Sequence, residues 1–349
     1  MKKAIVCILA PILCLCLIAG CSGGGSGGGS GSGSGGTGTV YDLNIAHAGA
    51  EDTTSHQSFI WLKEKLEETG RFRVALYPNG QMGADREAIE GVQNNDVQMT
   101  CTSPAPQANF VDAAKIFDVP FAVLDLDMLR YLENDQGFLE SLRKYYAEKG
   151  FYLNYICDMT FRITTSRGRK ILTPDDCKGF NIRTMENANH MLLWQCLGAN
   201  PTPIAFTELY TALQQGTVDG QENALELSIT QKFYEQQDYA NLTNHLMHAN
   251  LTPVNLEWYN SLDDEAREIF DRLSIEARDY MHSLVDANMA DVVDFCNNNG
   301  MPVLDLTNDE RLAFAALTGA VDEKVDADMK SVGCDTYDAF RAAVDAYGG

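Results

Sequence analysis

The alternation of strand-like and helix-like segments is the feature that most constrains the fold of this chain. Residues 41–48, "YDLNIAHA", alternate in the manner of a strand, and residues 54–70 carry apolar side chains at helical spacing. A second strand is predicted at 71–78, a second helix at 84–97 and a third strand at 97–103. This β-α-β-α-β order predicts an α/β fold with a largely parallel sheet flanked by helices.

A second α/β unit is predicted in the middle of the chain. Residues 151–166 form a long strand-like run that we expect to cross between two lobes. Residues 179–184 predict a strand and 188–198 a helix, while 264–300 predict a helix long enough to run along both lobes. Further predictions are a helix with a break near Gly137 at 128–150, an extended segment at 200–206, a short helix at 207–216 and a strand within 251–262.

The start of the chain is typical of a secretory signal. Lys2 and Lys3 precede the apolar run Ala4–Ile18, and "LIAGC" ends at Cys21. A cysteine directly after such a run resembles a bacterial lipoprotein signal, which predicts a signal peptide at 1–20 and a lipid on the Cys21 thiol. A membrane-spanning helix is the alternative, but the run is a little short for one.

A tether is predicted between the lipidated cysteine and the folded body. Residues 22–39 are only Gly, Ser and Thr, so 21–39 should behave as a flexible linker, with a root-mean-square span of about 20–25 Å. An engineered linker is the alternative origin. The body that follows, about 310 residues from Val40, is large enough for two lobes with separate cores, and no later apolar run is long enough to cross a membrane.

The net charge excludes several classes of partner. It is −23 for the full chain, and removal of Lys2 and Lys3 with the signal would bring it to −25. Such a surface disfavours binding to DNA, RNA or acidic lipids, which need basic patches. A small ligand remains compatible, because a local pocket can oppose the global charge.

Neither the cysteines nor any sequence motif indicates a catalytic or metal-binding function. Six cysteines follow Cys21, none in a CxxC pair, so the sequence alone does not choose a disulfide pairing. Apolar contexts such as "LLWQCLG" favour buried free thiols. The chain has no HExxH, GxSxG or GxxxxGK[ST] motif, and its histidines show no metal spacing. We therefore expect no enzyme activity, no cofactor and no metal site.

Two arginines at the ends of strand-like segments stand out in so acidic a chain. Arg162 lies in "TFRI" and Arg183 in "NIRT". The planar guanidinium offers two parallel donors that fit a carboxylate. The alternative for each is a surface or structural ion pair with an aspartate or glutamate.

Long collinear blocks carry a specific resemblance. Residues 198–226, "GANPTPIAFTELYTALQQGTVDGQENALE", resemble the extracytoplasmic binding proteins of tripartite ATP-independent periplasmic (TRAP) transporters, the DctP-type solute receptors. Residues 161–183, 76–110 and 231–245 match further blocks of that family. The likeness covers nearly all of the predicted body.

The resemblance implies a two-lobe periplasmic-binding-protein-like fold with a hinge and a long helix spanning both lobes. Lobe I is expected at 40–159 plus 249–288, and lobe II at 160–248 plus 289–349. An organic acid is expected in the cleft between them.

The resemblance also implies ligand-binding residues in the second α/β unit. Arg183 matches the arginine that pairs with the ligand carboxylate, and Arg162 matches a second cleft arginine that supports ligand charge. Asn223, in "DGQEN", matches a cleft asparagine, and Phe206 matches an aromatic wall residue, with core packing as the alternative.

Loops of the first unit are expected to form the opposite wall, because loops after parallel strands face the cleft in such sheets. His56, Glu51 and Ser103 are candidates there, with helix capping as the plain alternative for the first loop. Glu186 and His190 begin a helix beside Arg183, and a helix N-terminus favours a bound anion. A solvated surface position is the alternative for His190.

The sequence therefore predicts a binding protein that captures an organic acid and delivers it to TRAP membrane subunits. Dicarboxylates, sugar acids, keto or hydroxy acids and aromatic acids all remain open. The protein is expected outside the cytoplasm, held to a membrane by its lipid. Two alternatives remain: a periplasmic enzyme with His56, Glu186 or His190 as a base, and a sensory receptor.

Overall fold

The computed structural model describes residues 38–348, so the predicted signal peptide, the lipidation at Cys21 and nearly all of the predicted tether lie outside the described residues. The strands are β1 (Tyr41–Ala46), β2 (Phe72–Tyr77), β3 (Met99–Thr100), β4 (Phe151–Ser166), β5 (Asn181–Thr184), β6 (Asn200–Pro203), β7 (Gly220–Asn223), β8 (Tyr239–Asn255) and β9 (Val303–Asp305). The α-helices are α1 (Thr54–Glu68), α2 (Asp85–Gln93), α3 (Pro104–Gln107), α4 (Leu126–Leu132), α5 (Gln136–Glu148), α6 (Ala188–Cys196), α7 (Leu209–Gln215), α8 (Leu225–Thr230), α9 (Leu256–Ser261), α10 (Asp264–Asn298), α11 (Asn308–Ala315), α12 (Gly319–Ser331) and α13 (Thr336–Tyr347). Short 3-10 helices are η1 (Asp112–Asp118), η2 (Pro174–Cys177), η3 (Phe206–Glu208) and η4 (Phe233–Glu235).

The strands form one continuous mixed sheet in the order β2-β1-β3-β8-β4-β7-β5-β6, with β9 beside β8. The strands β2, β1 and β3 pair in parallel at one end, and β7, β5 and β6 do so at the other. Between the two sets, β8 and β4 pair antiparallel with each other, β8 pairs antiparallel with β3 and β4 pairs antiparallel with β7, whereas β9 lies parallel to β8. The α/β class is confirmed, but the expectation of a largely parallel sheet holds only within each set.

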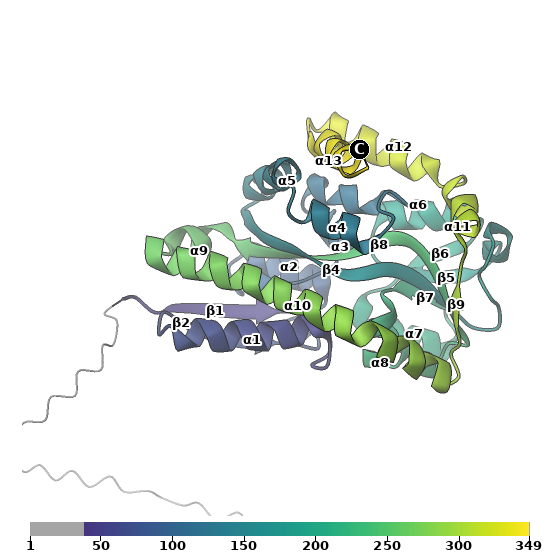
Figure 1. Cartoon of the computed structure of the whole chain (residues 1–349), viewed down its shortest axis with the longest axis horizontal. Helices are drawn as coiled ribbons and strands as arrows, with labels where there is room; N and C mark the ends of the chain where they lie inside the picture. Colours follow the sequence, from purple (N-terminus) through teal and green to yellow (C-terminus); the bar gives the residue numbers. More distant parts are fainter. Residues whose placement is uncertain (1–37, 349) are drawn as a thin grey trace, which may run out of the picture. The chain divides into compact units, whose positions relative to one another are not determined.

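The long strands β4 and β8 join the two strand sets (Figure 1). Their pairing has register shifts between Leu153 and Ile156, between Asp158 and Phe161 and again after Arg162. Thr160 has a φ of 78°, which is unusual for a β-branched residue. The sheet is therefore irregular where the two strands cross from one half to the other. The predicted crossing at 151–166 is confirmed.

The helix α10 runs past both halves of the sheet, as the sequence predicted (Figure 1). Its 35 residues give a length of about 50 Å. The side chain of Asp263 caps its N-terminus by accepting a hydrogen bond from the Ala266 amide. Phe270, Leu273 and Ala277 recur at helical spacing on the buried face, which explains why this helix packs along the body instead of projecting from it.

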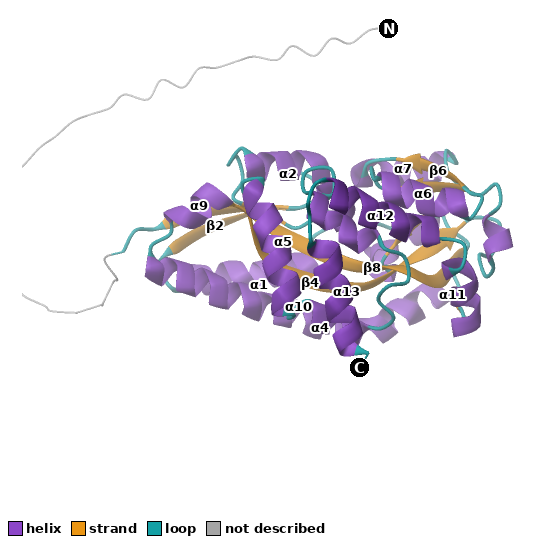
Figure 2. Ribbon diagram, turned by 90° about the horizontal axis from the view of Figure 1, so that it is seen from above, coloured by secondary structure: helices purple, strands orange, loops and turns teal. Residues whose placement is uncertain are grey.

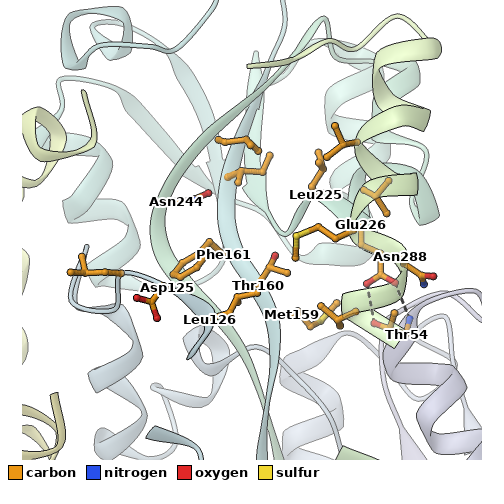
Figure 3. Close-up of a pocket in the computed structure, with 17 residues that line it drawn as sticks. Thr54, Asp125, Leu126, Met159, Thr160, Phe161, Leu225, Glu226, Asn244 and Asn288 are labelled. Atoms are coloured by element: carbon orange, nitrogen blue, oxygen red, sulfur yellow. Dashed lines mark hydrogen bonds between the residues drawn. The ribbon is translucent and has the colours of Figure 1, made fainter. Parts of the chain in front are cut away.

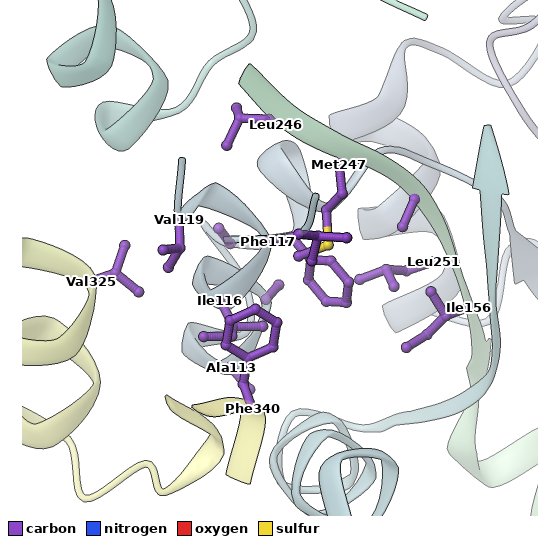
Figure 4. Packing of buried hydrophobic residues seen from close by; sticks show 14 of the residues in the cluster. Ala113, Ile116, Phe117, Val119, Ile156, Leu246, Met247, Leu251, Val325 and Phe340 are labelled. Carbon is purple, nitrogen blue, oxygen red and sulfur yellow. The ribbon is translucent and has the colours of Figure 1, made fainter. Parts of the chain in front are cut away.

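The largest core cluster is built around η1, between the sheet and the C-terminal helices (Figure 4). Ile116 and Phe117 of η1 are buried there with Leu251 of β8. Phe340 of α13 contacts Phe138 of α5, with ring centroids 5.6 Å apart. Figure 2 shows the C-terminal helices lying over this part of the sheet. The C-terminal segment therefore completes the core.

The predicted break near Gly137 in the helical segment 128–150 is confirmed, because α4 ends at Leu132 and α5 begins at Gln136, where Asp135 caps it by accepting from the Phe138 amide. One local prediction needs correction. The strand predicted within 251–262 is only the end of β8, which begins at Tyr239.

The six cysteines of residues 38–348 are unpaired, and five of them are buried, in line with the free-thiol expectation. Within the same residues, none of the helices has both the length and the hydropathy needed to cross a bilayer.

Candidate functional site

Two small adjoining cavities, each of about 60 Å³, lie where loops from both strand sets meet. We call them together the cleft. Asp85, Met185 and Phe206 line both cavities and so connect them. The segments after β1, β2 and β3 supply one wall, and those after β5, β6 and β7 supply the other. This is the carboxyl edge of both parallel sets, the usual ligand position in α/β sheets.

Arg183 lies on the cleft wall with unused hydrogen-bonding capacity. It is the third residue of β5, is 1% exposed, and lines the cavity that also contains Asp85 and Glu186. Its Nε donates to the Ile204 carbonyl at 2.8 Å, whereas its buried Nη1 has no hydrogen-bond partner. Burial lowers the pKa of Arg183 to about 10, with Glu222 opposing the shift, so the side chain remains a cation at neutral pH. A buried donor without a partner is costly and is suited to an incoming anion.

Arg162 occupies a different position from that of Arg183. It is 2% exposed, and its Nε and Nη2 donate to the Glu222 carboxylate. Nη2 also donates to the Asn223 Oδ1 at 2.9 Å, and Nη1 lies 3.3 Å from the His248 Nε2. Protein acceptors therefore occupy its donors behind the wall. Its predicted contact with a ligand stays a prediction.

The carboxylate of Glu222 is the centre of this buried network. Besides Arg162, it has His245 Nε2 at 3.3 Å and His190 Nδ1 at 3.5 Å. Burial alone would raise the pKa of Glu222, but Arg162 and the two histidines hold it well below its usual range. His190 also lies 3.1 Å from Asp118 of η1. The alternative of a solvated surface position for His190 is therefore wrong, because the side chain is 3% exposed.

The wall from the first strand set differs in part from the prediction. Ser103 lines the cleft as expected, together with Asn223 and Phe206 from the opposite side. His56 lies behind the wall with its Nδ1 2.9 Å from the Nε2 of His47, which does line the cleft. Burial, reinforced by His56, lowers the pKa of His47 to about 3, so this imidazole is neutral.

Two predicted carboxylates are exposed. Glu51 lies in the turn before α1 and lines neither cavity of the cleft, so its predicted wall position is wrong. Glu186 does line the Arg183 cavity, and its carboxylate lies 4.0 Å from Arg86 across the cleft.

Sequence reasoning missed Asp85, the first residue of α2. It is half-buried and lines both cavities. Burial raises the pKa of Asp85 to about 6, with the charges of Arg183 and Arg162 opposing the shift. An acid at a helix start is a normal dipole feature, so the sequence carried no signal of its cleft position. Other missed wall residues are His47, Thr53, Ser55, Met159, Met185, His248 and Asn250.

Polar contacts join the two sides near the cleft. The Thr54 amide and hydroxyl donate to the Glu226 carboxylate at 2.9 and 3.1 Å, linking α1 to α8. Asn187 Nδ2 donates to the Ala105 carbonyl at 3.0 Å, and Asn109 Nδ2 donates to the Glu186 carbonyl at 2.8 Å. In this structure, the two sides of the cleft are therefore in direct contact.

A separate apolar cavity of about 370 Å³ lies among α10, β4 and β8 (Figure 3). Its walls include Phe161, Leu225 and Met289, and its charged lining residues are Asp125 and Glu226. Both are acids, so this cavity offers an organic anion no cationic partner among the residues that line it. The cleft is the better candidate for anion binding.

Comparison with known proteins gives one family. Residues 45–327 match the profile of DctP, bacterial extracellular solute-binding protein, family 7. A solute-binding protein of Verminephrobacter eiseniae is 33% identical over 287 residues, covering 81% of this chain and 84% of the relative.

Solved structures agree with this match. A TRAP periplasmic solute-binding protein from Desulfovibrio salexigens, with bound orotic acid, has a TM-score of 0.83 and 25% identity, covering 88% of this chain and 99% of that protein. A TRAP periplasmic solute-binding protein from Polaromonas, bound to D-erythronate, has a TM-score of 0.80 and 28% identity, covering 86% of this chain and 98% of that protein.

Proposed function

Because this chain belongs to the DctP family of bacterial extracellular solute-binding proteins, we propose that Arg183 is the residue with which it grips the carboxylate of a small organic acid in the cleft. One observation carries the proposal: the buried Nη1 of Arg183 has no hydrogen-bond partner in the cleft wall. A ligand carboxylate would satisfy this donor and neutralise the charge. Charge-assisted bonds of this kind are about twice as strong as neutral ones.

Asp85 narrows the proposed ligand class. Its carboxyl lines both cavities opposite the walls that carry Arg183 and Asn223. An ionised Asp85 accepts a hydrogen bond from a ligand hydroxyl but repels a second ligand carboxylate. The proposed ligand is therefore a monocarboxylate with hydroxyl groups, such as a sugar acid or hydroxy acid, in preference to a dicarboxylate. The D-erythronate bound by the Polaromonas protein is an acid of this kind.

Arg162 has a supporting role in this proposal. Its bonds to Glu222 and Asn223 would fix the Asn223 side chain, which lines the cleft. A positive charge behind the wall also favours an anion within it. The ligand would contact both strand sets, so it would favour the form in which they touch.

The proposal extends to delivery and location. The loaded protein would dock on TRAP membrane subunits, and it would release its ligand chemically unaltered. Export by the predicted signal and lipidation of Cys21 would keep it at a membrane, with the predicted tether leaving it free to move. Cys21→Ser should shift the mature protein from the membrane fraction to the soluble extracytoplasmic fraction. A membrane fraction that retains the variant would overturn the anchor.

Thermal-shift measurement against a panel of carboxylates tests the proposed grip. The panel includes sugar acids, hydroxy acids, keto acids, aromatic acids and C4-dicarboxylates. A stabilising acid should lose its effect in Arg183→Ala and bind at least tenfold more weakly to Arg183→Lys, because lysine lacks the planar fork. Arg73→Ala is the control, since that side chain is 74% exposed. Equal affinity of wild type and Arg183→Ala would remove the proposed anchor.

A further inference from the structure

A buried cluster away from the cleft joins three elements at the point where the sheet crosses between its halves. Glu133 caps the C-terminus of α4, Asp158 lies in β4 beside a register shift, and His282 lies in α10. One ligand atom from each side chain lies within 4.8 Å of the other two. The other five histidines line the cleft or belong to the buried networks behind its walls.

The distances within the cluster resemble those between metal ligands. His282 Nε2 is 3.0 Å from Glu133 Oε2 and 3.4 Å from Asp158 Oδ2. Metal–ligand bonds of about 2.0–2.1 Å place neighbouring ligand atoms about 2.8–3.0 Å apart in octahedral geometry and about 3.3–3.4 Å apart in tetrahedral geometry. The two separations from His282 are close to these values.

The hydrogen bonding within the cluster is incomplete. Both Glu133 carboxylate oxygens, Asp158 Oδ1 and His282 Nε2 lack a hydrogen-bond partner, although Glu133 is 1% exposed and Asp158 is fully buried. The His282 nitrogen and the carboxylates are close, yet they are not aligned as donor and acceptor. An ordinary buried ion pair is aligned as hydrogen bonds, so these unpaired buried atoms lack the partner that buried polar groups normally have.

Neighbouring arginines do not replace the missing partner. Arg130 Nε donates to Asp158 Oδ2 at 2.7 Å, but its other nitrogens bind Asp286. Arg278 donates to Asp279 and Asn134. Two buried carboxylates thus share part of one guanidinium charge, and the other cationic group beside them is His282, which is charged only when it is protonated. A buried carboxylate without a full counter-charge is unfavourable.

We propose that Glu133, Asp158 and His282 bind a divalent transition-metal ion that ties α4, β4 and α10 together at the crossing. One imidazole and two carboxylates suit Zn²⁺, Mn²⁺ or Co²⁺ better than Ca²⁺, which prefers oxygen ligands alone. Arg130 supports the site by orienting the Asp158 carboxylate through its bond to Oδ2, which leaves Oδ1 without a protein partner. The site is separate from the cleft, so it goes beyond ligand capture.

Metal analysis of the mature protein tests the site. After removal of metals with a chelator and equilibration with Zn²⁺, wild type should hold about one ion per chain and melt at a higher temperature. Glu133→Gln and His282→Gln should bind Zn²⁺ at least tenfold more weakly and lose the thermal shift. Asp291→Asn, an exposed carboxylate of the same helix, should behave as wild type.

The identity of the metal ligands is tested without relying on the variants. X-ray absorption at the zinc edge should report one imidazole, with oxygen ligands completing the shell. A wild-type protein that holds no Zn²⁺ at micromolar free metal would overturn the proposal, and the cluster would then be a histidinium–carboxylate group. Sulfur ligands, or several imidazoles, would place the ion elsewhere and overturn it equally.

Discussion

At the scale of single residues, the two arginines that look alike in sequence have different surroundings. Arg183 keeps a free donor at the cleft, while Glu222 and Asn223 engage Arg162 behind it. The position of Arg183 could be predicted because a strand end in an α/β sheet faces the ligand edge. The pairing of Arg162 could not, since Glu222 lies on a strand far along the chain and its sequence context gives no sign of burial. The role of Asp85 could not be predicted either, because an aspartate at the start of a helix is common in any protein.

Substitution of Glu222 should show how much the buried network stabilises the fold. Glu222→Gln leaves Arg162 without its carboxylate, and breaking a buried pair in this way costs roughly 3–5 kcal/mol. The pKa of Glu222 is lowered in the folded state, so its contribution is present above the pKa of the unfolded chain and is lost as the pH falls through the folded value. Urea unfolding measured from pH 3 to 7 should therefore show that the free energy of unfolding falls less on acidification in Glu222→Gln than in wild type. Identical pH dependence in both proteins would contradict this role.

The pH dependence of stability caused by Asp85 should be opposite to that caused by Glu222. Its pKa is raised to about 6, so stability is full below the unfolded value, near 3.9, and falls as the pH rises through about 6. Asp85→Asn should raise the melting temperature of the ligand-free protein at pH 7.5 and change it little at pH 4. Asp291→Asn serves as an exposed control. A gain that is equal at both pH values would mean that the charge of Asp85 is not its cause.

At the scale of elements, periodic segments were predicted well and the crossing strands only in part. The helix α10 follows a regular apolar spacing over 35 residues, which fixed its extent. The strand β8 was missed over most of its length because "ANLTNHLMHAN" mixes polar and apolar residues without alternation. Its polar side chains, such as His245 and Asn241, are buried in networks with other strands. Such partners are set by tertiary structure and leave no local pattern.

The contact between α1 and α8 should govern how tightly the two sides hold together. Glu226 accepts two hydrogen bonds from Thr54. Glu226→Ala removes both hydrogen bonds. We expect the ligand to dissociate faster from this variant and therefore to bind more weakly. The contact between the two sides should lose at most about 1.5–3 kcal/mol for each hydrogen bond to the carboxylate. Stopped-flow dissociation of a bound acid measures this. Glu235→Ala, which loses only an exposed bond to Tyr210, is the matched control, and equal rates would exclude a clamping role.

At the scale of the whole molecule, two strand sets share one sheet, one long helix and one set of C-terminal helices. The proposed lobe boundaries, 40–159 plus 249–288 and 160–248 plus 289–349, place the hinge near Thr160, where the backbone has a positive φ. The position of α13 against α5 was not predictable, because a short amphipathic helix can pack on either half. The fold class was predictable because the order of elements and the collinear blocks both point to it.

The central claim is that the Arg183 guanidinium holds the carboxylate of the natural ligand. A crystal structure of the protein with the acid that stabilises it most tests this directly. We predict a carboxylate oxygen about 2.7–2.9 Å from Arg183 Nη1, with Asp85 facing a ligand hydroxyl. A ligand seated in the apolar cavity beside Phe161 and Met289, with Arg183 bonded only to protein atoms, would contradict the account.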